Sequence, residues 1–599
     1  MSKRVPRELL FGNPEKASPK ISPNGKLWAY LAPDEGVLNI WVGPEGGTAR
    51  PLTKDRGRGV RVFLWAEDQI SILYLQDVNG DENWHLHQTD IETGVTRDLT
   101  PYPGAQAQIV ATEPRFPHEI LIALNDRDPK LHDVWRLDLR SGERTLEAKN
   151  PGDAIGWMPD HRFKIGLHKA MGPDGGTILR VRDGEGWRDF LTCGPDDQLG
   201  AHGFTPDGAH VYIESSVGRD TTALLEVPLA GGSGRVLAEH PGSDLGAVLI
   251  HPRDYKAEAA AFEVDRQEWR VLDQALTGDF TALAALNGEV SIVSRNDADT
   301  VWYLLVNKPD RSPAFLRWDR ATRIAAPLFS TRPGLDAYTL APMAPIKFAA
   351  RDGLTIRGCL TTPVGREPKK LPLVLLVHGG PWVRDHWGFH PEAQWLASLG
   401  FAALQLNYRG SAGLGKRHLH AGDREWGAAM QDDLTDGVRW AVSQGIADPA
   451  RVAIYGGSYG GYAALAGAAF TPGVYRCAID VVGPSNLITL IKSIPPYWEP
   501  LKRIFDLRVG SVEKEEEFLK SRSPLFHVDK IDIPLLIAQG AHDPRVKQAE
   551  SEQIVAALRA KGKPVEYLLY PDEGHGFAKP ANRLAFYASA EAFLAKHLS

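Results

Sequence analysis

Hydrophobic positions divide the chain into two parts with different patterns. Residues 1 to about 335 carry short, alternating apolar segments broken by Pro, Gly, Asn and Asp, which predicts strands joined by turns. Further on, fully apolar runs such as Leu373–Val377 and Leu535–Ala538 predict buried strands of a parallel sheet. We therefore expect an all-β domain over residues 1–337 and an α/β domain over 338–599, with a linker around Leu335–Lys347.

A loose repeat runs through the first part. A turn such as Ser22–Gly25 or Thr205–Gly208 is followed by a strand such as Leu27–Tyr30 and then by a second strand. The repeat returns at roughly 40–50 residues, the period of four-stranded propeller blades. We expect a β-propeller of about seven blades, with six or eight left open, and blades that start near Ile21, Phe63, Pro114, Trp157, Phe204, His251 and Ile292.

A candidate nucleophile lies in the second part. Val452–Ala469 reads as a strand, the turn Gly456-Gly457-Ser458-Tyr459-Gly460 and a helix of small residues. A serine on such a turn projects above the sheet edge, and the glycines around it let backbone pass where a side chain would clash. This pattern predicts the nucleophile elbow of an α/β-hydrolase with a mostly parallel, doubly wound sheet, and Ser458 as its nucleophile.

A serine hydroxyl needs a base and an orienting carboxylate, which follow the serine in the order Asp, His in this fold. Asp543 comes directly after the predicted strand ending at Gln539, and His575 lies in a glycine-flanked loop after the strand Val565–Tyr570. Taken alone, Asp543 could be an ordinary helix cap and His575 an ordinary solvent-exposed loop histidine. Their order and placement predict the triad Ser458, Asp543 and His575.

The oxyanion that forms during acyl transfer needs preorganised hydrogen-bond donors. We expect one from the backbone N–H of Tyr459, the residue after the nucleophile. The apolar strand 373–377 opens into His378-Gly379-Gly380, and we assign the Gly380 N–H as the second donor, with Gly379 as the alternative. His378 is expected to support this loop without taking part in the chemistry.

Several blocks now support a family resemblance. From about Leu371 to its end, the chain resembles the catalytic domain of the prolyl oligopeptidase family. The HGGP loop is more similar to that of acylaminoacyl peptidases than to loops that place a tyrosine side chain in the oxyanion hole. The matching blocks are HGGPW (378–382), NYRGSAGLG (407–415), WG (426–427), DDLTDGVRW (432–440), GGSYGGY (456–462), HDPRV (542–546) and DEGHGF (572–577).

The resemblance carries expectations about substrate binding. It implies that Arg545, two residues beyond Asp543, holds the carbonyl of the second substrate residue, for which a guanidinium fork is suited. It also implies a serine enclosed between the two domains, so that only short peptides reach it. Dipeptidyl peptidase relatives bind the peptide's amino terminus with a pair of propeller glutamates; the sequence identifies no such pair, and Glu82 and Asn83 are not assigned to it. Tyr497 and Trp498 could line an apolar pocket or pack between domains.

Charge and composition exclude several other classes. The net charge is −7 with the basic residues dispersed, which disfavours a nucleic-acid partner. No apolar run is long enough to cross a membrane and no leader is evident, so a cytoplasmic location is expected. The three cysteines are scattered and do not predict disulfides. The stretch 77–88 begins like a calcium loop but lacks its glycine and final glutamate, and we expect no metal and no cofactor.

Three functions remain in order of preference. The first is a serine peptidase of short peptides, releasing N-terminal or N-acylated amino acids through an acyl-enzyme, with dipeptidyl peptidase or endo-oligopeptidase activity as alternatives. The second is a carboxylesterase that uses the same triad on small esters. The third is a catalytically silent propeller that binds a partner. A homo-oligomer is compatible with the sequence.

Overall fold

The structure is a computed structural model and describes residues 3–598. Its first part is a seven-bladed β-propeller, as predicted, with six four-stranded blades and one three-stranded blade. The blades, in chain order, are β1 (Ala17–Ile21), β2 (Leu27–Asp34), β3 (Val37–Pro44) and β4 (Arg50–Pro51); β5 (Val62–Trp65), β6 (Ser71–Gln76), β7 (His85–Asp90) and β8 (Thr96–Asp98); β9 (Ala107–Ala111), β10 (Glu119–Asp128), β11 (Leu131–Asp138) and β12 (Arg144–Ala148); β13 (Ala154–Pro159), β14 (Ile165–Met171), β15 (Thr177–Asp183) and β16 (Gly186–Cys193); β17 (Leu199–Phe204), β18 (His210–Ser215), β19 (Ala223–Pro228) and β20 (Arg235–Ala238); β21 (Leu245–Ile250), β22 (Ala257–Glu263) and β23 (Gln267–Val271); and β24 (Glu289–Arg295), β25 (Val301–Asn307), β26 (Ala314–Asp319) and β27 (Ile324–Ser330).

The predicted blade starts mark the first strand of each blade. Five of them fall inside that strand, His251 directly follows β21, and Pro114 lies three residues after β9. The blade near His251, weakly marked in the sequence, is the one with three strands. After it the chain forms η1 (Gln274–Leu276) and α2 (Thr277–Ala284) in place of a fourth strand.

Side-chain packing joins the first and last blades. Ile21 and Tyr30 of the first blade form one buried cluster with Val301 and Tyr303 of the last. The Ile21 N–H donates to Ser294 Oγ at 3.1 Å. Within residues 3–598, no strand of one of these blades pairs with a strand of the other. The ring is therefore closed by apolar packing and isolated polar contacts.

The second part is an α/β-hydrolase with an eight-stranded sheet, which confirms the predicted fold class. The strand order is β28-β29-β31-β30-β32-β33-β34-β35, antiparallel from β28 through β31 and parallel thereafter. The strands are β28 (Met343–Ala349), β29 (Thr355–Thr361), β30 (Leu371–Val377), β31 (Ala402–Asn407), β32 (Ala447–Gly457), β33 (Cys477–Val481), β34 (Leu535–Gly540) and β35 (Val565–Tyr570). A short helix, η2 (Pro333–Ala337), connects β27 to β28.

Helices cover both faces of this sheet. Leu373 and Leu375 pack into a core with α5 (Ala429–Ser443), α6 (Tyr459–Phe470) and α10 (Gln548–Ala560), while Val374 and Leu376 pack on the opposite face with α3 (Pro391–Ser398) and α11 (Pro580–Leu598). Alternate residues of one strand are thus buried on opposite faces, as in a doubly wound sheet. The remaining helices are α4 (Lys416–His420) and a segment between β33 and β34 with α7 (Leu487–Lys492), η3 (Pro496–Leu501), α8 (Lys502–Arg508), α9 (Glu516–Ser521) and η4 (Pro524–Lys530).

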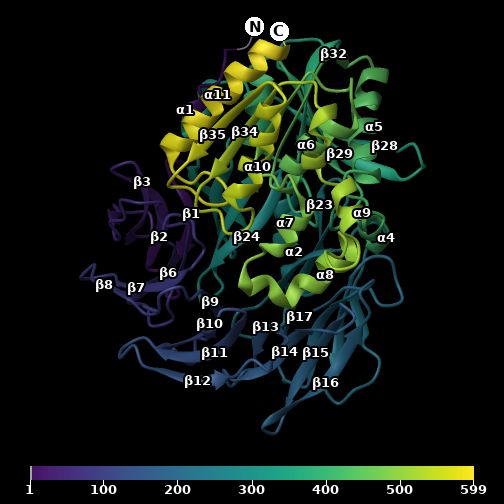
Figure 1. The fold of residues 1–599 in the computed structure, drawn as a ribbon. Coiled ribbons are helices and arrows are strands. Elements are labelled where there is room, and N and C mark those ends of the chain that lie inside the picture. The colour runs from purple at the N-terminus through teal and green to yellow at the C-terminus, as the bar shows by residue number, and fades with distance from the viewer. Residues whose placement is uncertain (1–2, 599) are drawn as a thin grey trace.

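The N-terminal helix α1 (Arg7–Phe11) lies with the hydrolase, although the expected propeller domain began at residue 1. Leu10 and Phe11 are buried in the core beside α3 and α11, and the Phe11 ring stacks on Tyr587 with centroids 3.4 Å apart. Figure 1 shows α1 beside the yellow α11. No helix of the described part of the chain is long and apolar enough to span a bilayer.

Candidate active site

The turn after β32 has the geometry of a nucleophile elbow. Ser458 has φ 57° and ψ −121°, a strained conformation for a residue with a side chain, and α6 begins at the next residue. A Cβ on Gly456 would lie 2.5 Å from the backbone of Gly460, and one on Gly460 would lie 2.1 Å from the Val377 carbonyl oxygen. The glycines two residues either side of Ser458 are therefore required by close backbone packing.

Asp543 and His575 are in contact. His575 Nδ1 lies 2.7 Å from Asp543 Oδ2, and the carboxylate side chain is fully buried. The other oxygen, Oδ1, accepts the backbone N–H groups of Arg545 and Val546, both at 2.9 Å. The carboxylate is thus held from its own loop, and an Nδ1–H that donates to it leaves Nε2 of His575 as the proton acceptor.

The three candidate residues follow strands in the parallel part of the sheet, at its carboxyl edge, with β33 lying between β32 and β34. Ser458 follows β32, Asp543 follows β34 and His575 follows β35. Gly457 and Gly576, the neighbours of Ser458 and His575, line the same cavity of about 320 Å³, together with Gly379. The elbow, the histidine loop and the predicted oxyanion loop therefore meet around one space.

The oxyanion loop lies directly against the elbow. A Cβ on Gly379 would be 3.4 Å from Ser458 Cβ. Tyr459 is the first residue of α6, so its N–H lies ahead of the helix's own hydrogen-bond ladder. The assignment of the Gly380 N–H as the second donor stays a prediction. His378 stacks on Tyr408 with ring centroids 4.4 Å apart and bonds to Ser411 Oγ at 3.0 Å; burial lowers its pKa, which fits a neutral support for the loop.

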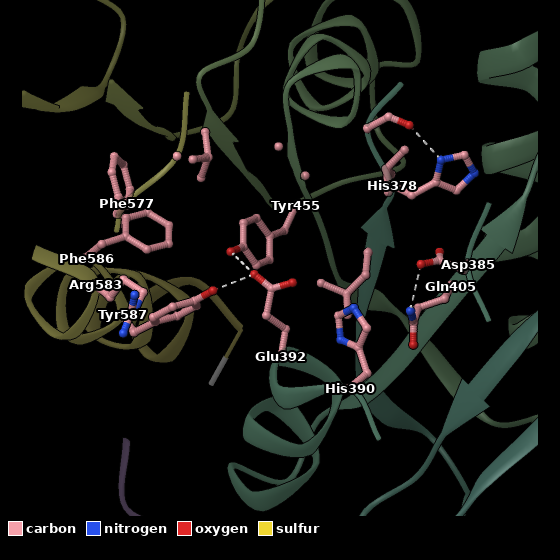
Figure 2. Close-up of a pocket in the computed structure, with 17 residues that line it drawn as sticks. His378, Asp385, His390, Glu392, Gln405, Tyr455, Phe577, Arg583, Phe586 and Tyr587 are labelled. Atoms are coloured by element: carbon pink, nitrogen blue, oxygen red, sulfur yellow. Dashed lines mark hydrogen bonds between the residues drawn. The ribbon is translucent and has the colours of Figure 1, made fainter. Parts of the chain in front are cut away.

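Behind the elbow, the 320 Å³ cavity contains a polar link between three elements. Figure 2 shows Glu392 of α3 between Tyr455 of β32 and Tyr587 of α11. The Tyr587 hydroxyl donates to Glu392 Oε1 at 2.7 Å, and the Tyr455 hydroxyl donates to the same oxygen. Burial raises the pKa of both tyrosines, so they stay protonated as donors. This link fixes the strand that carries the serine.

A larger cavity of about 880 Å³, the interdomain cavity, lies between propeller and hydrolase. Tyr497, Trp498 and Arg545 line it from the hydrolase side, and the substrate-binding role of these three residues stays a prediction. The propeller lines it with strands of the second to fourth blades and with Glu82, which lies between β6 and β7. Burial lowers the pKa of the propeller residue His132 to about 4, so this wall residue is neutral at neutral pH.

Glu82 is the functional candidate that sequence reasoning did not assign. Its carboxylate lies 2.9 Å from Arg545 Nε and accepts from the Tyr497 hydroxyl at 2.8 Å, and the Arg545 guanidinium lies over the Trp498 ring at 5.6 Å. Glu82 has a positive φ of 59° directly after the Asn79-Gly80 turn. That turn was readable in the sequence, but nothing local links position 82 to position 545.

Potential metal ligands gather at one place in the described part of the chain, within the propeller. One group within residues 3–598 brings three potential ligands together, His251, Glu258 and Asp299. Arg295 donates to Glu258 at 2.8 Å and Arg320 donates to Asp299. The two carboxylates are therefore already neutralised by arginines.

The fold and this site define a serine hydrolase with a β-propeller domain. The profile of the prolyl oligopeptidase family matches residues 387–599. Dipeptidyl aminopeptidase BIII of Pseudoxanthomonas mexicana is 42% identical over 99% of this chain and 88% of its own length. This chain therefore belongs to the prolyl oligopeptidase family and is a serine peptidase.

Two further comparisons show a local similarity of sequence and a similarity of fold. An acylamino-acid-releasing enzyme of Arabidopsis thaliana is 32% identical over 35% of this chain and 28% of its own length. A puromycin-hydrolyzing peptidase of Mycobacterium tuberculosis has the same fold, with a TM-score of 0.79 and 20% identity over 99% of this chain and 96% of that one. The similarity to the acylamino-acid-releasing enzyme covers little more than a third of this chain, whereas that to the dipeptidyl aminopeptidase extends over nearly all of it.

Proposed function

We propose that this peptidase removes dipeptides from the free amino termini of short peptides. Ser458 Oγ attacks the carbonyl of the second residue and gives its proton to His575 Nε2, while Asp543 holds the Nδ1–H. The N–H groups of Tyr459 and Gly380 stabilise the oxyanion. His575 then protonates the leaving amine, and a water activated by the same imidazole hydrolyses the acyl-enzyme.

The observation that carries this proposal is the Glu82 carboxylate in the interdomain cavity. A free α-amino group is an ammonium near neutral pH, and a carboxylate is its natural partner. Tyr497 and Arg545 fix the orientation of this carboxylate, so less is lost in ordering it when substrate binds. In the first residues of an unmodified peptide, the positive charge that can pair with Glu82 is that of the amino terminus.

Arg545 connects the Glu82 carboxylate with the proposed triad. Its backbone N–H bonds to Asp543 while its side chain reaches Glu82, so one arginine side chain separates the two sites. That length is comparable with the roughly 7 Å that two extended residues span. The ion pair uses Nε, and the outer N–H groups of the guanidinium can bind the carbonyl of the substrate residue whose amine Glu82 holds.

The alternative functions, release of N-acylated residues and hydrolysis of small esters, give the Glu82 carboxylate no partner in the substrate. An N-acylated substrate has no charge for this carboxylate, which would then be desolvated without gain. A simple ester would use the triad and leave the interdomain cavity unfilled. This proposal also agrees with the name of the bacterial relative, a dipeptidyl aminopeptidase, whose similarity extends over nearly the whole chain.

The test compares p-nitroanilides of a dipeptide, a single amino acid and an N-acetylated dipeptide, with products identified by mass spectrometry. We expect the free dipeptide substrate to have the highest kcat/KM. Glu82→Gln should lower its kcat/KM about 10–100-fold, the value of a charge-assisted hydrogen bond, and leave the acetylated substrate unchanged. Release of single residues or preference for acetylated substrate would contradict the proposal.

Glu113→Gln is the matched control. Glu113 also accepts from an arginine and a tyrosine hydroxyl, Arg115 at 2.7 Å and Tyr255 at 2.8 Å, but it does not line the interdomain cavity. Its substitution should leave kcat/KM for the dipeptide substrate unchanged. An equal loss in both variants would show that Glu82 acts through propeller stability.

A further inference from the structure

The loop that carries His575 touches the propeller directly. We call residues 572–577 the base loop. A Cβ on Gly574 would lie 2.3 Å from the Gly80 carbonyl oxygen, and one on Gly80 would lie 2.6 Å from the Gly574 nitrogen. The two backbones are packed so closely that neither position can hold a side chain. The residue before the proposed base is thus in contact with the β6–β7 loop of the second blade.

Glu573 organises the base loop from within. Its side chain is fully buried, and its carboxylate accepts the backbone N–H groups of Ala578 at 2.9 Å and Lys579 at 2.8 Å. Its own carbonyl accepts the N–H of His542 at 2.9 Å, which ties the base loop to the loop of Asp543. One buried residue therefore holds both loops whose side chains form the His575–Asp543 contact.

The cation that neutralises Glu573 belongs to the propeller. Arg58, between β4 and β5, places Nη1 at 3.0 Å from Glu573 Oε2, and only 8% of its side chain is exposed. Asp77 lies 3.5 Å from Arg58 Nε and belongs to the same loop as Gly80 and Glu82. Removing one partner of a buried ion pair leaves the other charge uncompensated, which is strongly unfavourable.

We propose that Arg58 and Glu573 are positioning residues through which the propeller sets the place of the catalytic imidazole. The inference rests on the proposed role of His575 as the base, but not on dipeptide release. Arg58 acts through Glu573 on the base loop, so it is needed even for a substrate too small to touch the propeller. The propeller then contributes to the chemical step as well as to substrate binding.

The experiment uses the full-length protein and p-nitrophenyl acetate, which has no amino group to reach Glu82. Arg58→Met should lower kcat about 100-fold, the effect of a displacement of about 1 Å in a reacting group, and leave KM within about twofold. Arg58→Lys keeps the charge and should recover most of the lost kcat. The double variant Arg58→Met/Glu573→Gln removes both charges, and its loss should be at least about tenfold smaller than the product of the two single losses.

Arg357→Met is the matched control. Arg357 pairs with Asp265 at 2.7 Å, which also joins hydrolase to propeller but contacts no residue of the base loop. Its kcat on the ester should stay within about twofold of the parent. An equal loss in Arg357→Met, an unchanged kcat in Arg58→Met, or additive single losses would each overturn the inference.

Failure of the proposed function gives a different pattern. If His575→Gln keeps ester hydrolysis, the assignment of the base is wrong, whatever Arg58 does. If dipeptides are not released while Arg58→Met still loses kcat on the ester, the positioning role stands and only the substrate assignment fails. Should Arg58→Met not fold, the loss of kcat in Glu573→Gln carries the test, because Arg58 then keeps Asp77 as its partner and only the ion pair with the base loop is lost.

Discussion

Substitution of Asp543 by asparagine tests the proposed triad most directly, because the structure fixes which way the new amide must point. Asp543 Oδ1 accepts two backbone N–H groups, and Oδ2 faces His575 Nδ1. In Asp543→Asn the amide oxygen keeps the two N–H bonds, and the NH₂ group then faces the imidazole. Nδ1 must accept from it, so the proton moves to Nε2, which can no longer take the proton of Ser458.

The expected loss of kcat is set by the cost of flipping the new amide by 180°. The flipped rotamer would accept the Nδ1–H of His575 and so preserve the productive tautomer. It places NH₂ against the N–H groups of Arg545 and Val546 and breaks both bonds. At about 1–3 kcal/mol for each buried donor left unpaired, that rotamer is disfavoured by about 2–6 kcal/mol. With about 1.4 kcal/mol for each factor of ten, kcat should fall by roughly 30-fold to 2 × 10⁴-fold.

The assay is the steady-state hydrolysis of a dipeptidyl p-nitroanilide at neutral pH, with thermal unfolding as the check on the fold. The isosteric change leaves the fold intact, so the melting temperature should stay close to that of the parent. A variant that keeps more than about a tenth of the parent kcat would refute this reasoning, since neither amide rotamer then blocks the imidazole.

Three further predictions concern the nucleophile, the cavity and a buried histidine. Ser458→Ala should lower kcat about 10⁵–10⁶-fold and abolish labelling by a fluorophosphonate, and retained labelling would place the nucleophile elsewhere. Arg545→Ala should lower kcat/KM for the dipeptide substrate about 10–100-fold but that for p-nitrophenyl acetate by less than about threefold; equal losses would remove its role in peptide binding. Burial lowers the pKa of His418 from 6.5 to about 4, so the unfolded state binds a proton first as the pH falls, and the free energy of unfolding should drop by about 3 kcal/mol between pH 6.5 and 4. Melting temperatures of the parent and of His418→Gln across that pH range measure this contribution of His418. If the two plots of melting temperature against pH run parallel, the contribution is absent.

The sequence predicted those features of the fold that depend on residues close together in the chain. The turn at Ser458 needs glycines at fixed offsets, and the turns Ser22–Gly25 and Thr205–Gly208 separate the first two strands of their blades, so both features could be predicted without coordinates. The order of Asp543 and His575 after successive strands also predicted that they would meet, because neighbouring parallel strands end at one edge.

Contacts between distant segments could not be read in this way. Glu82 meets Arg545, and Arg58 meets Glu573, only because the propeller is placed over the hydrolase. No periodicity links such positions. The expected propeller domain included residues 7–11 for the same reason, since five residues of mixed character do not show which core will bury Leu10 and Phe11.

The position of α1 has a consequence for how this protein can be divided. Because Leu10 and Phe11 are buried against α3 and α11, the propeller is an insertion in the hydrolase, and the chain enters and leaves it from the same partner. A protein truncated to residues 338–599 would expose an apolar surface that includes Trp395 and Tyr587. Such a surface favours self-association. A stably folded hydrolase half must therefore keep α1 together with the C-terminal half, and without the propeller it would still lack Arg58.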